Sequence, residues 1–229
     1  MNEIPVKLKK RRPREKRTPN DGLRLYSALT HGIGVWLASV GTGVLIVMSA
    51  FAGARYIVGY SVYGLTLIGL YTASTLYHCL PVRPGGRRAL RKIDHIMIYM
   101  LIAGTYTPIC LIALTGAWRW TLFGVIWGLA VAGTVVKLFW LNAPRWLSAS
   151  AYIGMGWMAL IAIVPLVRSM SGLELMWLGL GGFFYTAGGV LYALKWPGKG
   201  NKFFGFHEVF HIFVMLGSVC HYAMMICLL

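Results

Sequence analysis

Apolar stretches of about 20 residues recur along the chain beyond residue 21, and almost no charged residue interrupts them. About 20 apolar residues in helical conformation are enough to cross the hydrocarbon core of a bilayer. A helix also satisfies its own backbone hydrogen bonds, for which lipid offers no partner. The chain is 58% hydrophobic and 12% charged, and its acids beyond residue 21 are Asp94, Glu174 and Glu208. The pattern predicts an all-α integral membrane protein and excludes an ordinary soluble domain.

Prolines, glycines and short polar turns divide the apolar sequence into seven predicted membrane spans. These spans cover residues 25–51, 57–80, 95–115, 118–140, 146–167, 173–194 and 206–228. Because the connectors are short, we expect neighbouring helices to be antiparallel and to form one bundle over residues 21–229. Residues 1–20 are basic and have too few apolar side chains to form a core, so we predict a disordered tail.

The net charge of +16 comes from basic residues that border the apolar spans. Eight of the 22 Lys and Arg residues lie within residues 7–17, and five more within residues 83–92. Cytoplasmic loops of membrane proteins accumulate such residues. We therefore predict a cytoplasmic N-terminus, an extracytoplasmic C-terminus and a multi-pass protein of the cell inner (plasma) membrane. The expected partners are membrane lipids rather than nucleic acid, with anionic lipids attracted to the tail by roughly 1 kcal/mol per basic residue.

Histidines from distant parts of the chain fall at one predicted depth. His207 and His211 are four residues apart, which puts their Cβ atoms about 5–6 Å apart on one helix face. His78 closes the second span, with Ser74 one turn before it, and Asp94 opens the third. Three imidazoles and a water make the open tetrahedral site of catalytic zinc, beside which a carboxylate can act. The alternative to a metal site is that the histidines are structural and hydrogen-bonded. The alternative for Asp94 is that it pairs with a neighbouring loop cation, either Arg91 or Lys92.

The segment from His207 to His211 also matches HExxH, in which the glutamate is the general base of a zinc protease. The third ligand of such a protease usually follows the motif, and only His221 is available there. His221 lies ten residues beyond His211, about 15 Å further along the helix. The competing interpretation makes Glu208 a carboxylate that the dipole favours at a helix N-terminus.

In combination, these motifs resemble the hemolysin III proteins, the bacterial branch of the progestin and adipoQ receptor (PAQR) family. The resemblance is carried by Ser74-xxx-His78, by Asp94-His95, by the run AGTYTP at 103–108, and by His207-xxx-His211. It implies a seven-helix bundle with zinc on the three histidines, and with Asp94 and Ser74 beside the zinc-bound water. It also implies hydrolysis of an amide in a lipid, as in the related ceramidases.

One part of the sequence departs from the family pattern. The family commonly carries an acid and an asparagine shortly before the histidine of the first span, whereas this chain has Arg24 and Ser27 before His31. Three functions remain open: a zinc-dependent lipid amidohydrolase, a non-catalytic membrane-homeostasis or pore-forming cytolytic protein with structural zinc, and an intramembrane protease. A site closed by four protein ligands would favour the second function, and a site with room for water would favour the first.

Overall fold

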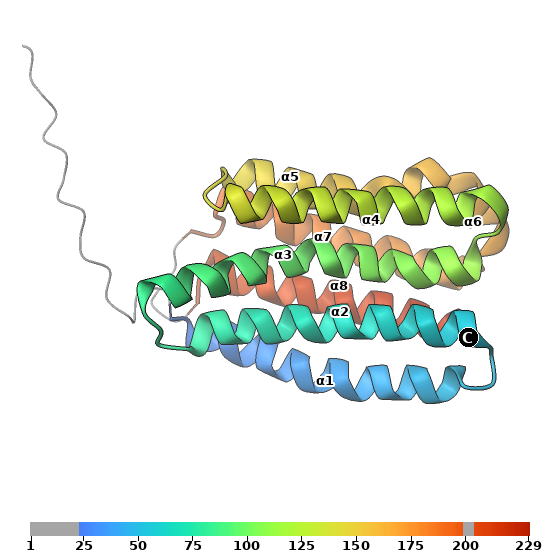
Figure 1. Cartoon of the computed structure of the whole chain (residues 1–229), viewed down its shortest axis with the longest axis horizontal. Coiled ribbons are helices and arrows are strands. Elements are labelled where there is room, and N and C mark those ends of the chain that lie inside the picture. Colours follow the sequence, from blue (N-terminus) through green and yellow to red (C-terminus); the bar gives the residue numbers. More distant parts are fainter. Residues whose placement is uncertain (1–22, 199–203) are drawn as a thin grey trace, which may run out of the picture.

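A computed structural model describes residues 23–198 and 204–229, and every regular element within them is a helix (Figure 1). The elements are α1 (Leu25–Ser49), α2 (Ala54–Cys79), α3 (Pro84–Pro108), a π-helical turn (Ile109–Ala113), α4 (Gly116–Phe139), α5 (Arg145–Gly156), a 3₁₀ segment (Trp157–Ala162), α6 (Ile163–Ser169), α7 (Gly172–Leu194) and α8 (Phe206–Cys227). They form 7 segments that are long and apolar enough to cross a membrane. The predicted seven-helix membrane class is confirmed, and the predicted disordered tail lies outside the described residues.

The helices pack side by side, and the bundle closes where α1 meets α8 (Figure 1). Helix α2 packs between α1 and α3, and α7 packs between α5 and α8. Large apolar side chains such as Trp36 and Val131 are exposed on the outside of the bundle, as contact with lipid requires. One end of the bundle therefore gathers the end of α2 and the beginnings of α3, α5 and α8 (Figure 1).

Helix α3 begins well before the predicted span. Its first residue is Pro84, a position at which the missing N–H of proline costs no hydrogen bond. The next turn forms at once, because Arg87 N donates to Arg83 O at 3.0 Å. The prediction that residues 81–93 form a loop before the third span is therefore wrong. Asp94 lies inside α3 rather than at its start. Hydropathy marks only the apolar part of a helix, and the charged extension of α3 has none of that signal.

The predicted fifth span is broken in its middle, between α5 and α6. Pro165 has no N–H to donate to the preceding turn, and the chain there winds as a 3₁₀ segment. Tyr106 stabilises the break with its hydroxyl, which donates to Gly156 O at 2.6 Å and accepts from Ala159 N at 2.7 Å. Irregular backbone at membrane depth needs such partners from within the protein.

We expect Gly104→Ala to destabilise the bundle, because α2 and α3 approach closely at this glycine. A Cβ atom at Gly104 would lie 2.9 Å from Thr66 Cβ and 3.0 Å from Thr66 Cγ2. Overpacking of this kind costs about 1–3 kcal/mol, which thermal unfolding in detergent would measure. The control is Gly128→Ala on α4, where the new methyl group meets nothing within 4 Å. Equal unfolding temperatures for the two variants would contradict the close approach.

Candidate metal centre

Three histidine side chains converge at the end of the bundle where α2 ends and α8 begins. The Nε2 atom of His207 lies 3.0 Å from His78 Nε2 and 3.1 Å from His211 Nε2. The possible ligand atoms of all three residues lie within 4.8 Å of one another. Zinc–nitrogen bonds of about 2.0–2.1 Å place the nitrogens of a tetrahedral site roughly 3.3 Å apart. The cluster can therefore hold a metal ion, although three imidazoles alone do not define which one.

The positions of the three rings follow from the local sequence. His207 and His211 lie in the first two turns of α8 and share one face through their four-residue spacing. His78 lies in the last turn of α2, so its ring meets them from the neighbouring helix. The end of α2 is also tied to the start of α1, because Arg24 N donates to His78 O at 3.1 Å. His78 is thus held by α2 and tied to the start of α1, whereas His207 and His211 come from α8.

Asp94 and Ser74 line the same cavity as His207 and His211. The cluster of possible ligands in the described residues contains the three histidines and not Asp94. Asp94 and Ser74 therefore share a cavity wall with His207 and His211, and Asp94 lies outside the group of possible ligands. Their catalytic roles stay a prediction.

The alternative pairing of Asp94 with a loop cation does not occur in the structure. Arg91 NH1 donates instead to Asn142 Oδ1 at 3.2 Å, and Lys92 Nζ donates to Leu138 O at 2.7 Å. The ionisable neighbour of the Asp94 carboxylate is His95, whose Nδ1 lies 3.4 Å from Asp94 Oδ2. Asp94 therefore keeps its place in the cavity wall without a lysine or arginine partner in the described chain.

His31 supports the metal-site histidines from α1. Its ring stacks on the ring of His211, with centroids 3.7 Å apart and planes 13° apart. On another side the edge of its ring meets Tyr71 at a centroid distance of 5.0 Å. Tyr71 is fixed in turn, because its hydroxyl donates to Ser218 Oγ at 2.8 Å. His31 therefore packs directly on a ring of the histidine cluster.

Glu208 is held by α1 and not directed at the histidine nitrogens. Arg24 NH1 donates to both of its carboxylate oxygens, at 2.9 and 3.1 Å, and Ser27 Oγ donates to Oε1 at 2.9 Å. Gly205 N, at the start of α8, donates to Oε2 at 2.9 Å. The side chain is only 3% exposed, so these bonds satisfy a buried charge. This arrangement supports the helix-start interpretation of Glu208 over that of a protease base.

Arg24 and Ser27 are the two positions at which the sequence departs from the family pattern, and sequence reasoning missed their role. Both bind the residue that follows a predicted metal ligand, so they fix the start of α8 against α1. A signal was present in the composition. Glu208 is one of three acids beyond residue 21, and a buried acid in a membrane protein needs a partner.

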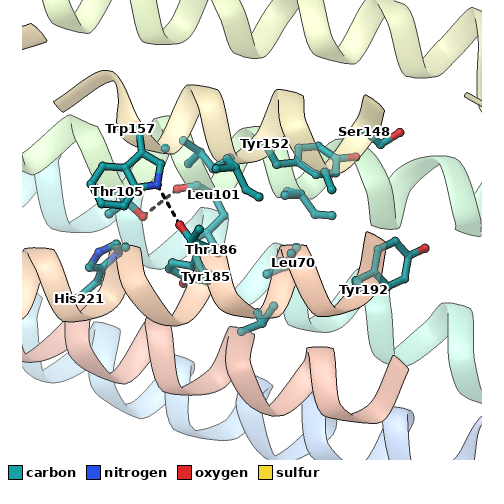
Figure 2. Close-up of a pocket in the computed structure, with 18 of the residues that line it drawn as sticks. Leu70, Leu101, Thr105, Ser148, Tyr152, Trp157, Tyr185, Thr186, Tyr192 and His221 are labelled. Atoms are coloured by element: carbon teal, nitrogen blue, oxygen red, sulfur yellow. Dashed lines mark hydrogen bonds between the residues drawn. The ribbon is translucent and has the colours of Figure 1, made fainter. Parts of the chain in front are cut away.

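A cavity with a volume of about 370 Å³ extends from the histidines into the bundle. Its walls come largely from apolar side chains of α3, α5, α7 and α8. Figure 2 shows Ser148 and Tyr192 at one end of the cavity, and Thr105, Trp157 and His221 at the other. A long, mainly apolar cavity with a few polar groups suits a ligand with a hydrocarbon chain.

His221 belongs to the deeper part of this cavity and not to the histidine cluster. Its Nε2 atom lies 3.4 Å from Leu178 O, and the residue is absent from the group of possible metal ligands. The structure thus separates His221 from the other two histidines of α8. This separation removes the downstream histidine that a zinc protease would use as its third ligand.

We expect Glu208→Gln to weaken metal binding and to spare any hydrolysis that the metal-loaded protein carries out. The variant loses the charge that Arg24 binds, a contact of about 1.5–3 kcal/mol, and this loosens the start of α8. Zinc affinity, measured by chelator competition, should fall about 10- to 100-fold, as for other partners that support a ligand. Glu174→Gln is the matched control, since Glu174 caps α7 at the other end of the bundle. If Glu208 were a general base, lipid-amide hydrolysis would stay abolished even at saturating zinc.

The fold and the site define a class of protein: an integral membrane protein with 7 helices able to span a membrane and three histidines able to hold a metal ion at one end of the bundle. The sequence model of the family described as Haemolysin-III related matches residues 24–222. The chain belongs to this family, which confirms the resemblance found in the motifs.

Similar proteins extend over most of the chain. The Hemolysin-3 homolog of Bacillus subtilis (strain 168) is 39% identical over 206 residues, which cover 90% of this chain and 92% of that protein. Hemolysin-3 of Bacillus cereus is 37% identical over 196 residues, which cover 85% and 86% of the two chains. The Monocyte to macrophage differentiation factor of Homo sapiens is 25% identical over 166 residues, which cover 70% of this chain and 66% of that protein.

Proposed function

We propose that the chain is a zinc-dependent hydrolase of a lipid amide that acts near the cytoplasmic face of the cell inner (plasma) membrane. The observation that carries the proposal is a cluster of three histidines, two of which, His207 and His211, line a long apolar cavity whose wall also includes Asp94 and Ser74. Within the described residues, the ligand cluster consists of three side chains, as in zinc sites that keep a position for water or substrate. A closed structural site would need a fourth protein ligand.

Each residue has a definite task in this reaction. When bound, zinc supplies Lewis acidity, which activates water and polarises a carbonyl at neutral pH. His78, His207 and His211 hold the ion, and Ser74 Oγ orients the attacking water. A carboxylate oxygen of Asp94 takes one proton from this water as its oxygen bonds to the carbonyl carbon. The same oxygen returns the proton to the amide nitrogen as the carbon–nitrogen bond breaks, which releases a fatty acid and an amine.

The cavity supplies the binding part of the proposal. Its apolar walls, with Leu70 and Leu101 among them, exclude water from an acyl chain that extends away from the histidines (Figure 2). Burial of such a chain contributes about 0.8 kcal/mol for each CH₂ group. Binding energy of this size would hold the amide beside Asp94.

The test is release of fatty acid from ceramides and other N-acyl lipids by the full chain purified in detergent. Treatment with a chelator should stop the release, and added zinc should restore it. Stoichiometric zinc without any release would overturn the proposal. The name Hemolysin-3, carried by a similar protein, is the observation behind a second candidate, membrane lysis. Dye leakage from liposomes that does not depend on zinc would favour that candidate.

The proposed orientation gives a separate prediction. Alkaline phosphatase fused after Leu229 should be active, because the enzyme folds only outside the cytoplasm and the Lys and Arg bias places this terminus there. The matched control is a fusion after Val82, in the loop between α2 and α3, which should be inactive. Phosphatase activity in whole cells is the measurement. The reverse pattern would place the histidine cluster at the extracytoplasmic face.

A further inference from the structure

Three cations from three helices line the cavity near the histidine cluster. They are Arg91 from α3, Lys137 from α4 and Arg145 from α5, and together they form what we call the basic end of the cavity. The basic end lies where α3 and α5 begin and α4 ends, so it is at the same end of the bundle as the histidines (Figure 1). In Figure 2 it corresponds to the end marked by Ser148 and Tyr192.

Lys137 is a buried cation without a counter-charge. Its exposed fraction is 2%, and its Nζ atom donates to Ser148 Oγ at 2.6 Å. An ammonium group has three N–H donors, so this bond uses one of them. Lys137 forms no ion pair with any acid in residues 23–198 and 204–229. Buried charges are normally paired, because an isolated one is expensive to desolvate.

The other two cations of the basic end also have neutral neighbours. Arg145 lies over the rings of Tyr192 and Phe206, with its Cζ atom 5.7 and 5.4 Å from their centroids. Arg91 donates to the side-chain amide of Asn142 at 3.2 Å. Arg91, Lys137 and Arg145 line the same cavity, so this wall carries three like charges. An anion between them would remove the repulsion and fill the free donors.

The preference for basic residues in cytoplasmic loops does not account for this arrangement. Topology needs cations near the membrane surface, where long side chains extend their charged ends into water. Lys92 follows that pattern, since it lies outside the cavity lining and donates to a backbone carbonyl, Leu138 O. Lys137 does not extend its charged end into water. The residue is covered by protein and lines the cavity.

We propose that the basic end of the cavity binds the phosphate group of an anionic lipid whose chains occupy the apolar remainder. A lipid headgroup and free phosphate would both bring a phosphate group to this site. Because the rest of the cavity is apolar, we assign the phosphate to a lipid rather than to a free ion. Anionic lipids are abundant in the cytoplasmic leaflet, next to which the proposed orientation places the basic end. The inference names the headgroup class of the substrate and to that extent rests on the proposed function.

Binding of short-chain lipids to the zinc-loaded full chain in an uncharged detergent tests this proposal. The probes are dioctanoyl phosphatidic acid, dioctanoyl phosphatidylcholine and inorganic phosphate, with affinity measured from the thermal unfolding temperature at increasing ligand concentration. Phosphatidic acid should bind at least about tenfold more tightly than phosphatidylcholine. Lys137→Met should weaken phosphatidic acid binding roughly 10- to 100-fold, the equivalent of one charge-assisted hydrogen bond. Lys92→Met makes the same chemical change outside the cavity lining and should leave the affinity unchanged.

Arg145→Gln provides a second test at an exposed position, where the substitution leaves the bundle core intact. It should also weaken phosphatidic acid binding and spare phosphatidylcholine. Equal affinity of the wild type for the two lipids, or full affinity in both variants, would overturn the proposal. Equal binding of inorganic phosphate would overturn the assignment to a lipid. A protein that prefers phosphatidic acid but releases no fatty acid would refute the proposed hydrolysis and leave this inference standing.

Discussion

Protein purified without a chelator is expected to contain about one zinc ion per chain, and His211→Ala is expected to lose most of it. The Nε2 atom of His211 lies 3.1 Å from that of His207, so the substitution removes one of three converging nitrogens. Loss of a residue that merely supports a ligand lowers metal affinity about 10- to 100-fold, so loss of a ligand should cost more than 100-fold. His78→Ala and His207→Ala should have the same effect, which elemental analysis would measure.

His221→Ala is the matched control for these three variants. It also removes a buried imidazole from the cavity wall, but from the deeper part, where its Nε2 atom faces Leu178 O. Its zinc content should equal that of the wild type. Equal zinc loss from all four variants would mean that the bundle had unfolded, which the thermal unfolding temperature would reveal. Wild-type protein without stoichiometric zinc would contradict the zinc site itself.

The histidine cluster could be predicted because two strong periodic signals coincide. Apolar runs of membrane length place residues in depth, and the helical repeat places His207 and His211 on one face. His78 is at the same depth on another span, so a compact bundle brings the three close together. When helices are joined by short connectors, the depth of a residue and the helix face on which it lies together nearly fix the position of its side chain in the bundle. The same reasoning predicted Ser74 one turn from His78 and Asp94 at a similar depth, and both residues line the cavity that His207 and His211 also line.

The backbone irregularities could not be predicted in the same way. Hydropathy is uniform across the 3₁₀ segment after α5, and only Pro165 marks the break. The start of α3 at Pro84 lies in a charged sequence that resembles a loop. In both places the conformation depends on hydrogen bonding: a local backbone bond starts α3, and the tertiary partner Tyr106 stabilises the break after α5.

Pairings between polar residues that are far apart in the sequence could not be predicted either. Nothing in the local pattern connects Arg24 with Glu208, because the two are 184 residues apart and meet only when α1 closes on α8. The charge bias alone would place the ammonium group of Lys137 at the membrane surface. Its burial in the cavity wall depends on how α4 faces α5, where Ser148 accepts its hydrogen bond. Charge bias determines which end of a helix is cytoplasmic, but not which face is covered.

Asp94→Asn is expected to retain zinc and to lose lipid-amide hydrolysis by about 10²–10⁴-fold, the usual contribution of a general acid–base. Asparagine keeps the size of the side chain and its place in the cavity wall, but it cannot accept and return a proton. The carboxylate is outside the ligand cluster of three histidines, so the metal content should not change. Fatty-acid release at saturating zinc is the measurement, with elemental analysis on the same preparation.

The outcome separates three roles for the Asp94 carboxylate. Zinc loss equal to that of His78→Ala would make Asp94 a direct ligand, which contradicts its position beside the cluster. Survival of both zinc and hydrolysis would reduce it to a polar group that contacts His95 at 3.4 Å. Glu174→Gln is the control, because it also neutralises an acid but lies at the start of α7, away from the cavity lining. Only retained zinc, lost hydrolysis and an unaffected control together would make Asp94 the residue that transfers the proton.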